Sequence, residues 1–221
     1  MRLLRWLRRR LRVLPSRAAY ALWAARYPAE AHNPFMMLEQ AAMLDLLPRV
    51  TGQRVLDAAC GTGRYARLLM EQGAAVVGCD HSLDMLRLAD GARCGGDLLR
   101  LPFGAATFDG IVCALAIGHT SALEAAVAEL GRVLRPSGWL LVSDLHPYQT
   151  LRGAQRTFRA ADGRHYAVEH HLHTMEATVQ ALNAAGLTLE AVREPQHAGW
   201  PTVLVWRARR LNAPAPAHSR P

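Results

Sequence analysis

One stretch decides the fold of this chain: Val55–Leu69, with the sequence VLDAACGTGRYARLL. It predicts a buried strand, then a loop of small residues, then a helix over residues 64–72 that Gly73 ends. Gly61 and Gly63 have no Cβ, so a ligand can lie directly against the main chain of the loop. The amides at the start of the helix point toward the same loop. The stretch therefore predicts a loop that can hold a nucleotide.

The spacing of the small residues permits two cofactors. Gly61-x-Gly63-x-x-Ala66 satisfies the dinucleotide fingerprint, in which a pyrophosphate lies at the helix N-terminus. Asp57 argues against a pyrophosphate, which its carboxylate would repel, and favours the ammonium group of an amino-acid cofactor. The stretch resembles motif I of the class I S-adenosylmethionine-dependent methyltransferases, acidic-x-Gly-x-Gly-x-Gly, with Ala59 at the first glycine. The resemblance implies S-adenosylmethionine as cofactor, and a nicotinamide-dependent oxidoreductase is the alternative.

The chain carries a formal net charge of +8, but its excess of arginine is confined to the two ends. Seven arginines fall in residues 1–17 and four in residues 207–221, where no acidic residue occurs. The residues between hold 15 arginines and 18 acidic residues. At 221 residues the chain can bury one substantial core. We therefore expect one domain without a basic nucleic-acid-binding face, although the arms could contact phosphate or lipid.

The four cysteines, at positions 60, 79, 94 and 113, fall in or beside predicted strands and show no Cys-x-x-Cys spacing. We expect reduced thiols in a cytoplasmic protein. His165, His171 and His173 could share a face, but histidines in such a segment more often contact a bound acceptor, so no metal site is expected. No apolar run approaches the ~20 residues that span a bilayer.

Residues 1–14 alternate leucine with arginine, which predicts a basic amphipathic helix that Pro15 and Ser16 end. Such an arm could lie on the anionic inner membrane surface, act in targeting, or stay solvated. We expect residues 1–16 to form this arm, residues 17–210 a single domain, and the Ala- and Pro-rich residues 211–221 a disordered tail.

Residues 17–47 are expected to form two helices, broken near Pro28 and Pro34, that close over the domain as a lid. The segment from Tyr20 to Tyr27 has the pattern Tyr-x-x-Trp-Ala-x-x-Tyr. It resembles the helix that precedes motif I in many small-molecule methyltransferases and folds over the cofactor. The resemblance implies that Tyr27 contacts the cofactor or the acceptor, with packing on the sheet as the alternative for these aromatic residues.

A second predicted strand, residues 75–80, ends in Asp80. Asp80 lies 17 residues after Gly63, close to the ~20-residue offset at which a carboxylate meets the ribose hydroxyls in doubly wound folds. Its two oxygens can accept hydrogen bonds from both hydroxyls. His81 follows, and the next predicted helix places Met85 where it can pack on the adenine.

Three later stretches extend the resemblance. A third predicted strand ends near Asp97 and Leu98, to which the resemblance assigns recognition of the adenine amine and ring nitrogen. Residues 101–113 resemble the family's Leu-Pro-Phe…Phe-Asp stretch, and residues 129–138 resemble its Glu-x-x-Arg-Val-Leu-x-Pro-Gly-Gly turn. The resemblance covers residues 20–206 and is closest to the small-molecule group that includes quinone-biosynthesis and malonyl-carrier-protein methyltransferases.

The alternation of strands and helices predicts the α/β fold class. With the resemblance, we expect a doubly wound, Rossmann-like, seven-stranded, mostly parallel sheet with an antiparallel last strand, helices on both faces, an N-terminal helical lid and a cap insert. Residues 187–192 and 202–206 are the last two predicted strands. The residues expected at the cofactor are Tyr27, Asp57, Ala59, Cys60, Gly61, Gly63, Asp80, His81, Met85, Asp97, Leu98 and Leu115.

The acceptor is expected at the carboxyl edge of the sheet, where open α/β folds bind their ligands. His146 is the candidate general base for an acceptor hydroxyl because histidine, with an unperturbed pKa of ~6.5, is the usual general base near neutral pH. His119 is the second candidate, and Asp144 could orient either histidine. We expect O-methylation of a small hydroxyl or carboxyl compound, with C- or N-methylation and a non-catalytic cofactor-binding protein as alternatives.

Regular alternation stops over residues 148–173, which we expect to form the cap that binds the acceptor. Asp162-Gly163 predicts the turn of a hairpin within it. Arg156 or Arg159 could bind an acidic acceptor. Neither the acceptor itself nor the oligomeric state follows from the residues.

Overall fold

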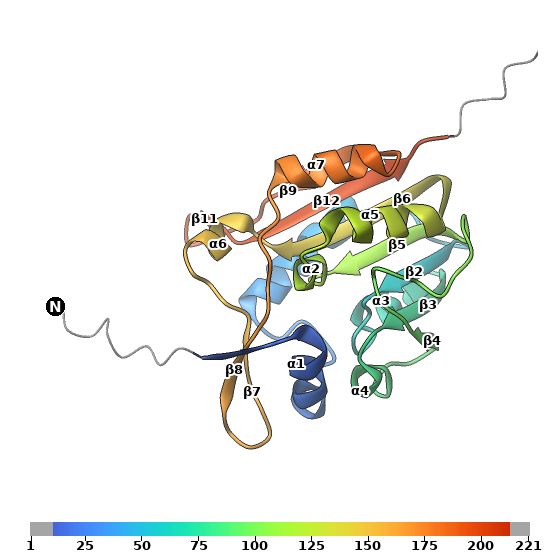
Figure 1. Ribbon diagram of the computed structural model, residues 1–221. Coiled ribbons are helices and arrows are strands. Elements are labelled where there is room, and N and C mark those ends of the chain that lie inside the picture. Colours follow the sequence, from blue (N-terminus) through green and yellow to red (C-terminus); the bar gives the residue numbers. More distant parts are fainter. Residues whose placement is uncertain (1–10, 213–221) are drawn as a thin grey trace, which may run out of the picture.

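The computed structural model describes residues 11–212 of the chain. Its centre is a seven-stranded sheet in the order β4-β3-β2-β5-β6-β12-β9 (Figure 1). The strands are β2 (Arg54–Ala58), β3 (Ala75–Asp80), β4 (Ala92–Gly95), β5 (Phe108–Ala114), β6 (Leu134–Leu145), β9 (Leu187–Arg193) and β12 (Val203–Arg210). β12 runs antiparallel to both of its neighbours, and the other neighbouring strands are parallel. The expected Rossmann-like sheet with an antiparallel last strand is confirmed.

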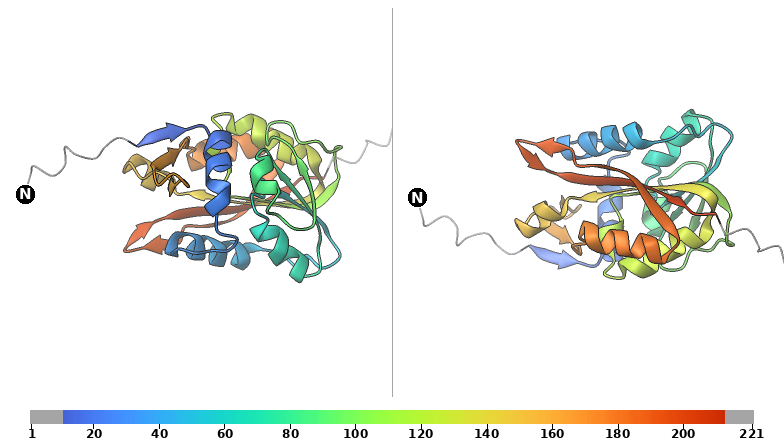
Figure 2. Two further views of the ribbon diagram at one scale, coloured as in Figure 1. Left: turned by 90° about the horizontal axis from the view of Figure 1, so that it is seen from below. Right: turned by 90° about the horizontal axis from the view of Figure 1, so that it is seen from above.

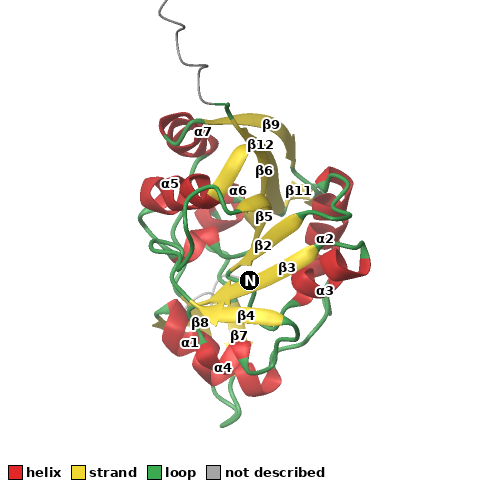
Figure 3. Cartoon of the chain, turned by 90° about the vertical axis from the view of Figure 1, so that its right-hand side faces the viewer, coloured by secondary structure: helices red, strands yellow, loops and turns green. Residues whose placement is uncertain are grey.

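Helices cover both faces of this sheet (Figures 2 and 3). One layer holds α2 (Pro34–Leu46) and α3 (Arg64–Glu71), and the other holds α5 (Leu123–Val133) and α7 (Met175–Ala184). The shorter elements are α1 (Ser16–Trp23), η1 (Ala24–Arg26), α4 (Leu83–Leu86), η2 (Ile117–His119), α6 (Pro147–Leu151), β10 (Gln196–His197) and β11 (Trp200–Pro201).

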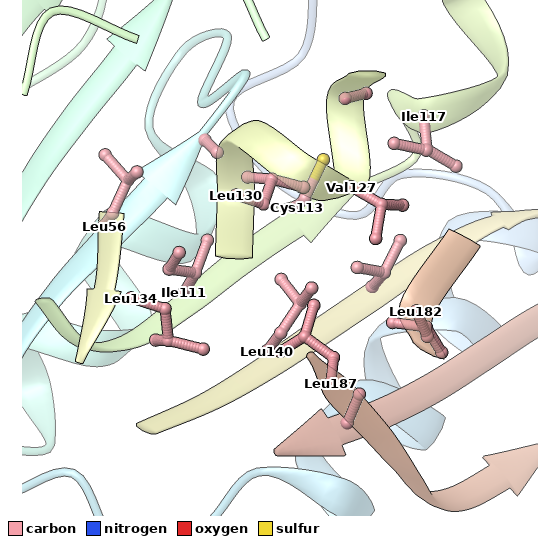
Figure 4. Close-up of a cluster of buried hydrophobic side chains, with 14 of the residues drawn as sticks. Leu56, Ile111, Cys113, Ile117, Val127, Leu130, Leu134, Leu140, Leu182 and Leu187 are labelled. Carbon is pink, nitrogen blue, oxygen red and sulfur yellow. The ribbon is translucent and has the colours of Figure 1, made fainter. Parts of the chain in front are cut away.

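The central strands are apolar on both faces, because each face packs against helices. Leu56 and Ile111 point into the cluster under α5 and α7 that Figure 4 shows, together with Leu130 and Leu182 of those helices. The neighbouring residue on β2, Val55, points into the opposite cluster, which α2 and α3 complete. Side chains alternate between the faces of a strand, so a continuous apolar run fills two cores at once.

A smaller three-stranded sheet joins the start of the chain to the cap insert. Its strands are β1 (Arg12–Leu14), β8 (His165–Val168) and β7 (Thr157–Arg159), and β1 pairs with β8 in parallel. β7 and β8 form the hairpin expected around Asp162-Gly163. Leu14 is 7% exposed and packs in a cluster with Phe158 and Val168.

The prediction that the amphipathic helix runs through Leu14 is wrong. Residues 12–14 are a strand because their backbone finds hydrogen-bonding partners on β8, which periodicity alone does not reveal. The folded domain therefore begins before residue 17. The rest of the predicted arm, residues 1–10, lies outside the described residues.

Leu211, the first residue of the predicted tail, is tied to the domain, since its amide donates to the carbonyl of Gly186. Residues 213–221 lie outside the described part. Over residues 11–212, no helix combines the length and the apolar content that crossing a bilayer requires.

Candidate functional site

A cavity of about 290 Å³ lies at the carboxyl ends of β2, β3 and β5. The glycine-containing loop after β2, the turn after β3 and the end of β4 line one half, which we call the cofactor half. Helix α1, η2 and the segment before β7 contribute Tyr20, His119 and Arg156 to the other half, which we call the acceptor half. This is the place at which open α/β sheets bind ligands.

The loop after β2 is tight because three of its residues take left-handed backbone conformations. Ala59, Gly61 and Gly63 have φ angles of 57°, 55° and 80°. A Cβ on Gly61 would lie 3.3 Å from the Cε of Met85, a close contact that a small shift of this flexible side chain would relieve, so the left-handed conformation is the main reason for glycine here. At Ala59 the left-handed conformation costs roughly 1–2 kcal/mol, because its Cβ crowds the following carbonyl oxygen.

Asp57, the second-last residue of β2, lies in the cavity wall and is only 2% exposed. Its Oδ2 accepts a hydrogen bond from the amide of Ala66, 2.9 Å away, in the first turn of α3. Burial raises the pKa of this carboxyl to about 7, although the hydrogen bond from Ala66 opposes the rise. A bound cation would favour the ionised form and so would bind more tightly as the pH rises.

Asp80 ends β3 beside the loop and is 8% exposed. Its Oδ2 accepts from the amide of Gly61 at 2.8 Å, and its Oδ1 accepts from the amide of Ser82 at 2.7 Å. Each oxygen keeps a lone pair. Burial raises the pKa of this carboxyl, against the pull of both amides. The carboxylate is thus oriented by the backbone and still able to accept from two hydroxyl groups.

All but one of the residues predicted at the cofactor line the cavity. Gly63 does not line the cavity but sets the start of α3. Trp23, in the predicted lid, stacks on Phe158 of the hairpin at 4.9 Å between ring centroids, whereas Tyr27 lines the cavity. The cavity lining includes, from the predicted cofactor set, Tyr27, Asp57, Ala59, Cys60, Gly61, Asp80, His81, Met85, Asp97, Leu98 and Leu115.

In the acceptor half, three side chains from distant parts of the chain meet at one ring nitrogen. The hydroxyl of Tyr20 lies 2.9 Å from His119 Nε2, and Arg156 Nη1 lies 3.2 Å from the same atom. His119 Nδ1 lies 2.8 Å from the carbonyl oxygen of Glu169. A carbonyl can only accept, so Nδ1 carries the proton, and the Nε2 lone pair accepts from Tyr20 and Arg156.

His119 is uncharged near neutral pH. Burial, together with the positive charge of Arg156, lowers its pKa to about 4. Burial also raises the pKa of the Tyr20 hydroxyl. At pH 7 the acceptor half therefore presents one permanent positive charge, on Arg156, beside a neutral imidazole and a neutral phenol.

The other two residues predicted for catalysis do not line this cavity. His146 caps α6, where its Nδ1 accepts from the amide of Tyr148 and its Nε2 lies 3.1 Å from a carboxylate oxygen of Glu194. Asp144 accepts from the amide of Gly118 and from His170, so it braces the segment that carries His119. The structure brings His119 to the cavity and leaves His146 outside it.

Sequence reasoning missed a buried carboxylate that binds two residues of the cavity wall, Arg64 and Tyr65, from behind. Glu39 on α2 is 0% exposed, and its Oε2 accepts from Arg64 at 2.7 Å. Its Oε1 accepts from Tyr65 at 2.8 Å and from Ser143 at 2.6 Å. A usable signal existed: Glu39 continues the buried stripe of Met36 and the later apolar residues of α2 at helical spacing.

Comparison with known proteins identifies similar chains. The family model described as a methyltransferase domain matches residues 56–142. A demethylmenaquinone methyltransferase of Beutenbergia cavernae is 36% identical over 126 residues, which are 52% of each chain. A malonyl-[acyl-carrier protein] O-methyltransferase of Pectobacterium atrosepticum is 32% identical over 166 residues, 65% of this chain and 66% of that one. The chain spans about half the length of the first curated relatives that it matches.

Among solved structures, the fold resembles an S-adenosylmethionine-dependent methyltransferase from Mesorhizobium loti. The TM-score is 0.67 at 26% identity, and the match covers 78% of this chain and 98% of the other.

Proposed function

Since the chain belongs to the class I S-adenosylmethionine-dependent methyltransferases, we propose that it transfers the methyl group of S-adenosylmethionine to an oxygen of a small acceptor. The cofactor, when bound, supplies a methyl group on positively charged sulfur. The protein's part is to bind and align the two molecules, because methyl transfer from a sulfonium is an in-line displacement.

One observation carries the cofactor assignment: two buried carboxylates, each at the end of a strand, flank one glycine-containing loop on one cavity. Asp57 would bind the ammonium of the amino-acid end, where a pyrophosphate would be repelled. Asp80 would accept hydrogen bonds from the ribose hydroxyls, since each of its oxygens is used only once by the protein. Asp97 and Leu98 would contact the adenine.

Calorimetric titration with S-adenosylhomocysteine tests this assignment. Asp80→Asn is expected to weaken binding by about 100-fold, because hydrogen bonds to charged groups contribute roughly 1.5–3 kcal/mol each. Asp84→Asn, on the exposed face of α4, is the matched control and is expected to bind as the unchanged protein does. Equal affinity of the Asp80 variant, or tighter binding of NADH than of S-adenosylhomocysteine, would contradict the assignment.

For the acceptor, the geometry favours His119 over His146 as the histidine that contacts it. His119 lines the cavity and is tied to Tyr20 and Arg156, whereas His146 is occupied by Tyr148 and Glu194. We propose that the acceptor lies against Tyr20, His119 and Arg156, with its reacting atom facing the cofactor half.

Transfer to carbon or nitrogen of a quinone-like acceptor is the second candidate, which the similarity to a demethylmenaquinone methyltransferase supports. Methyl-¹³C-labelled cofactor and NMR of the product distinguish the two, because a methyl carbon bonded to oxygen is deshielded relative to one bonded to carbon. Absence of any turnover with cofactor still bound would favour the non-catalytic alternative.

We also propose peripheral membrane contact through residues 1–10, whose sequence alternates leucine and arginine. Deleting residues 1–10 is expected to abolish sedimentation with phosphatidylglycerol vesicles, while phosphatidylcholine vesicles serve as the uncharged control. Unchanged sedimentation of the deletion variant would remove this idea.

A further inference from the structure

We propose that the acceptor is a small organic carboxylate, anchored by Arg156 and methylated on its own ionised oxygen, so that the cavity supplies no general base. The inference rests on the proposed function and adds the chemical class of the acceptor. Two observations carry it: a cation without a carboxylate partner among the described residues, and a histidine whose two ring nitrogens are both engaged.

Arg156 is the cation. Its Nη1 donates to the carbonyl of Leu115 at 2.6 Å and lies within reach of His119, which occupies both protons of that nitrogen. Its Nη2 and Nε, which together present three further N–H groups, have no acceptor among the described residues. This edge of a guanidinium matches the two oxygens of a carboxylate.

A second arginine of the cavity lining, Arg64, serves as a comparison, because it does have a carboxylate partner within the protein. Arg64 lies 2.7 Å from Glu39, and this pair is buried. No carboxylate of the described residues lies within 4.0 Å of Arg156 in the same way: Asp144 is occupied by His170 and the amide of Gly118. Arg156 is half-buried and lines the cavity, and among the described residues it has no carboxylate partner, so the site is suited to an anion brought by the ligand.

His119 is the histidine of the acceptor half that could act as a base, and both of its ring nitrogens already have hydrogen-bonding partners. Nε2 accepts from Tyr20 and Arg156, and Nδ1 donates to the Glu169 carbonyl. A hydroxyl acceptor would therefore have to displace one of these contacts to lose its proton. A carboxylic acid, with an unperturbed pKa near ~4, arrives already ionised and needs no base.

The reaction balances without proton transfer. A carboxylate oxygen forms the new bond to the methyl carbon while the carbon–sulfur bond breaks and leaves its electron pair on sulfur. The negative charge of the carboxylate and the positive charge of the sulfonium both disappear. The products are a methyl ester and a neutral thioether, and Tyr20 and His119 only position the oxygen.

Binding tests the anchor directly. With the protein saturated with S-adenosylhomocysteine at pH 8, we would record thermal shifts with hexanoate and benzoate and with hexanamide and benzamide, which match them in shape without the charge. The acids are expected to raise the melting temperature, and the amides are not. Arg156→Gln is expected to remove the effect while the affinity for S-adenosylhomocysteine stays within twofold. Arg164→Gln, an exposed change on the same hairpin, is the control.

Product chemistry tests the reaction. Methyl-labelled S-adenosylmethionine is incubated with the protein and the small-molecule fraction of a bacterial lysate. Label released as methanol by mild alkali marks a methyl ester, and this release is expected to fall by at least tenfold with Arg156→Gln. Alkali-stable label, equal stabilisation by acids and amides, or retention of the acid effect in Arg156→Gln would overturn the proposal. If S-adenosylhomocysteine itself does not bind, the proposed function fails first, so the two failures are distinguishable.

Discussion

The two halves of the cavity are built in opposite ways. The carboxylates and glycines of the cofactor half lie within residues 57–98 and come from consecutive strand–loop–helix units. The acceptor half joins residues that are far apart: Tyr20 and His119 are 99 positions apart, and His119 and Arg156 are 37 apart. A local sequence motif therefore forms the cofactor half, whereas packing between distant segments forms the acceptor half.

The halves also differ in charge. Asp57 and Asp80, two carboxylates with raised pKa values, face the cofactor half. Of the two arginines in the cavity lining, Arg64 is paired with Glu39, and Arg156 faces the acceptor half. Such a division suits a positively charged donor and a negatively charged acceptor in one cavity, because each ligand meets the opposite charge. The predictions below test this division.

The largest effect is expected behind the cavity wall, at Glu39. Glu39→Gln leaves Arg64 buried without its carboxylate, and the loss of one member of a buried pair costs about 3–5 kcal/mol of unfolding free energy. Urea denaturation measures it. Asp45→Asn, at an exposed ion pair on the same helix, is the control and should cost less than about 1 kcal/mol. A similar loss for both variants would show that Glu39 has no special part.

The next effect concerns the cofactor half alone. Because the pKa of Asp57 is raised to about 7, the folded protein without cofactor holds this proton more tightly than the unfolded chain does. Ionisation between about pH 4 and pH 7 therefore costs stability. Cofactor binding requires the ionised form, so affinity for S-adenosylhomocysteine should fall about tenfold for each pH unit below 7.

Calorimetry between pH 5.5 and 8.5 checks this dependence. Asp57→Asn should bind weakly and with an affinity that no longer changes with pH through this group. If the affinity of Asp57→Asn kept the full pH dependence, another group would be responsible for it. Asp57 would then not be the residue that binds the ammonium group.

A smaller effect compares the two predicted histidines. His119→Gln disturbs the contacts with Tyr20 and Arg156, so kcat/KM should fall about tenfold, the equivalent of one lost hydrogen bond. His146→Ala removes only a helix cap outside the cavity and should change kcat/KM by less than about twofold. At saturating cofactor, kcat should stay level from pH 6 to 8.5 if no base acts. A larger loss of kcat/KM in His146→Ala than in His119→Gln would make His146 the catalytic histidine again.

The smallest effect is a gain. Ala59→Gly removes the Cβ that disfavours the left-handed conformation and should add about 1 kcal/mol of stability. Ala58→Gly, next to it in β2, lacks that strain and should destabilise the protein. Differential scanning calorimetry of both variants separates these outcomes, and a loss of stability in Ala59→Gly would contradict the strain.

The success of the sequence predictions follows the same division. The strands around Asp57 and Asp80 were predictable because apolar runs, the glycine loop and strand ends are properties of a few neighbouring residues. His146 was preferred over His119 because both follow strands of the sheet, and only the packing of η2 under α1 shows which ring reaches the cavity. Leu14 was assigned to a helix because its partner on β8 lies about 150 residues away.

By themselves, the residues of Val55–Leu69 and the strand-ending acids determined the fold class and the cofactor half, because hydrogen bonding within short segments and alternation along strands are local physics. Only the tertiary structure decided that Arg156 has no carboxylate partner within residues 11–212 and that both ring nitrogens of His119 are engaged. Those facts depend on which side chains from distant segments come into contact. The contacts form only when α1, the edge of the sheet at η2 and the β7–β8 hairpin pack together.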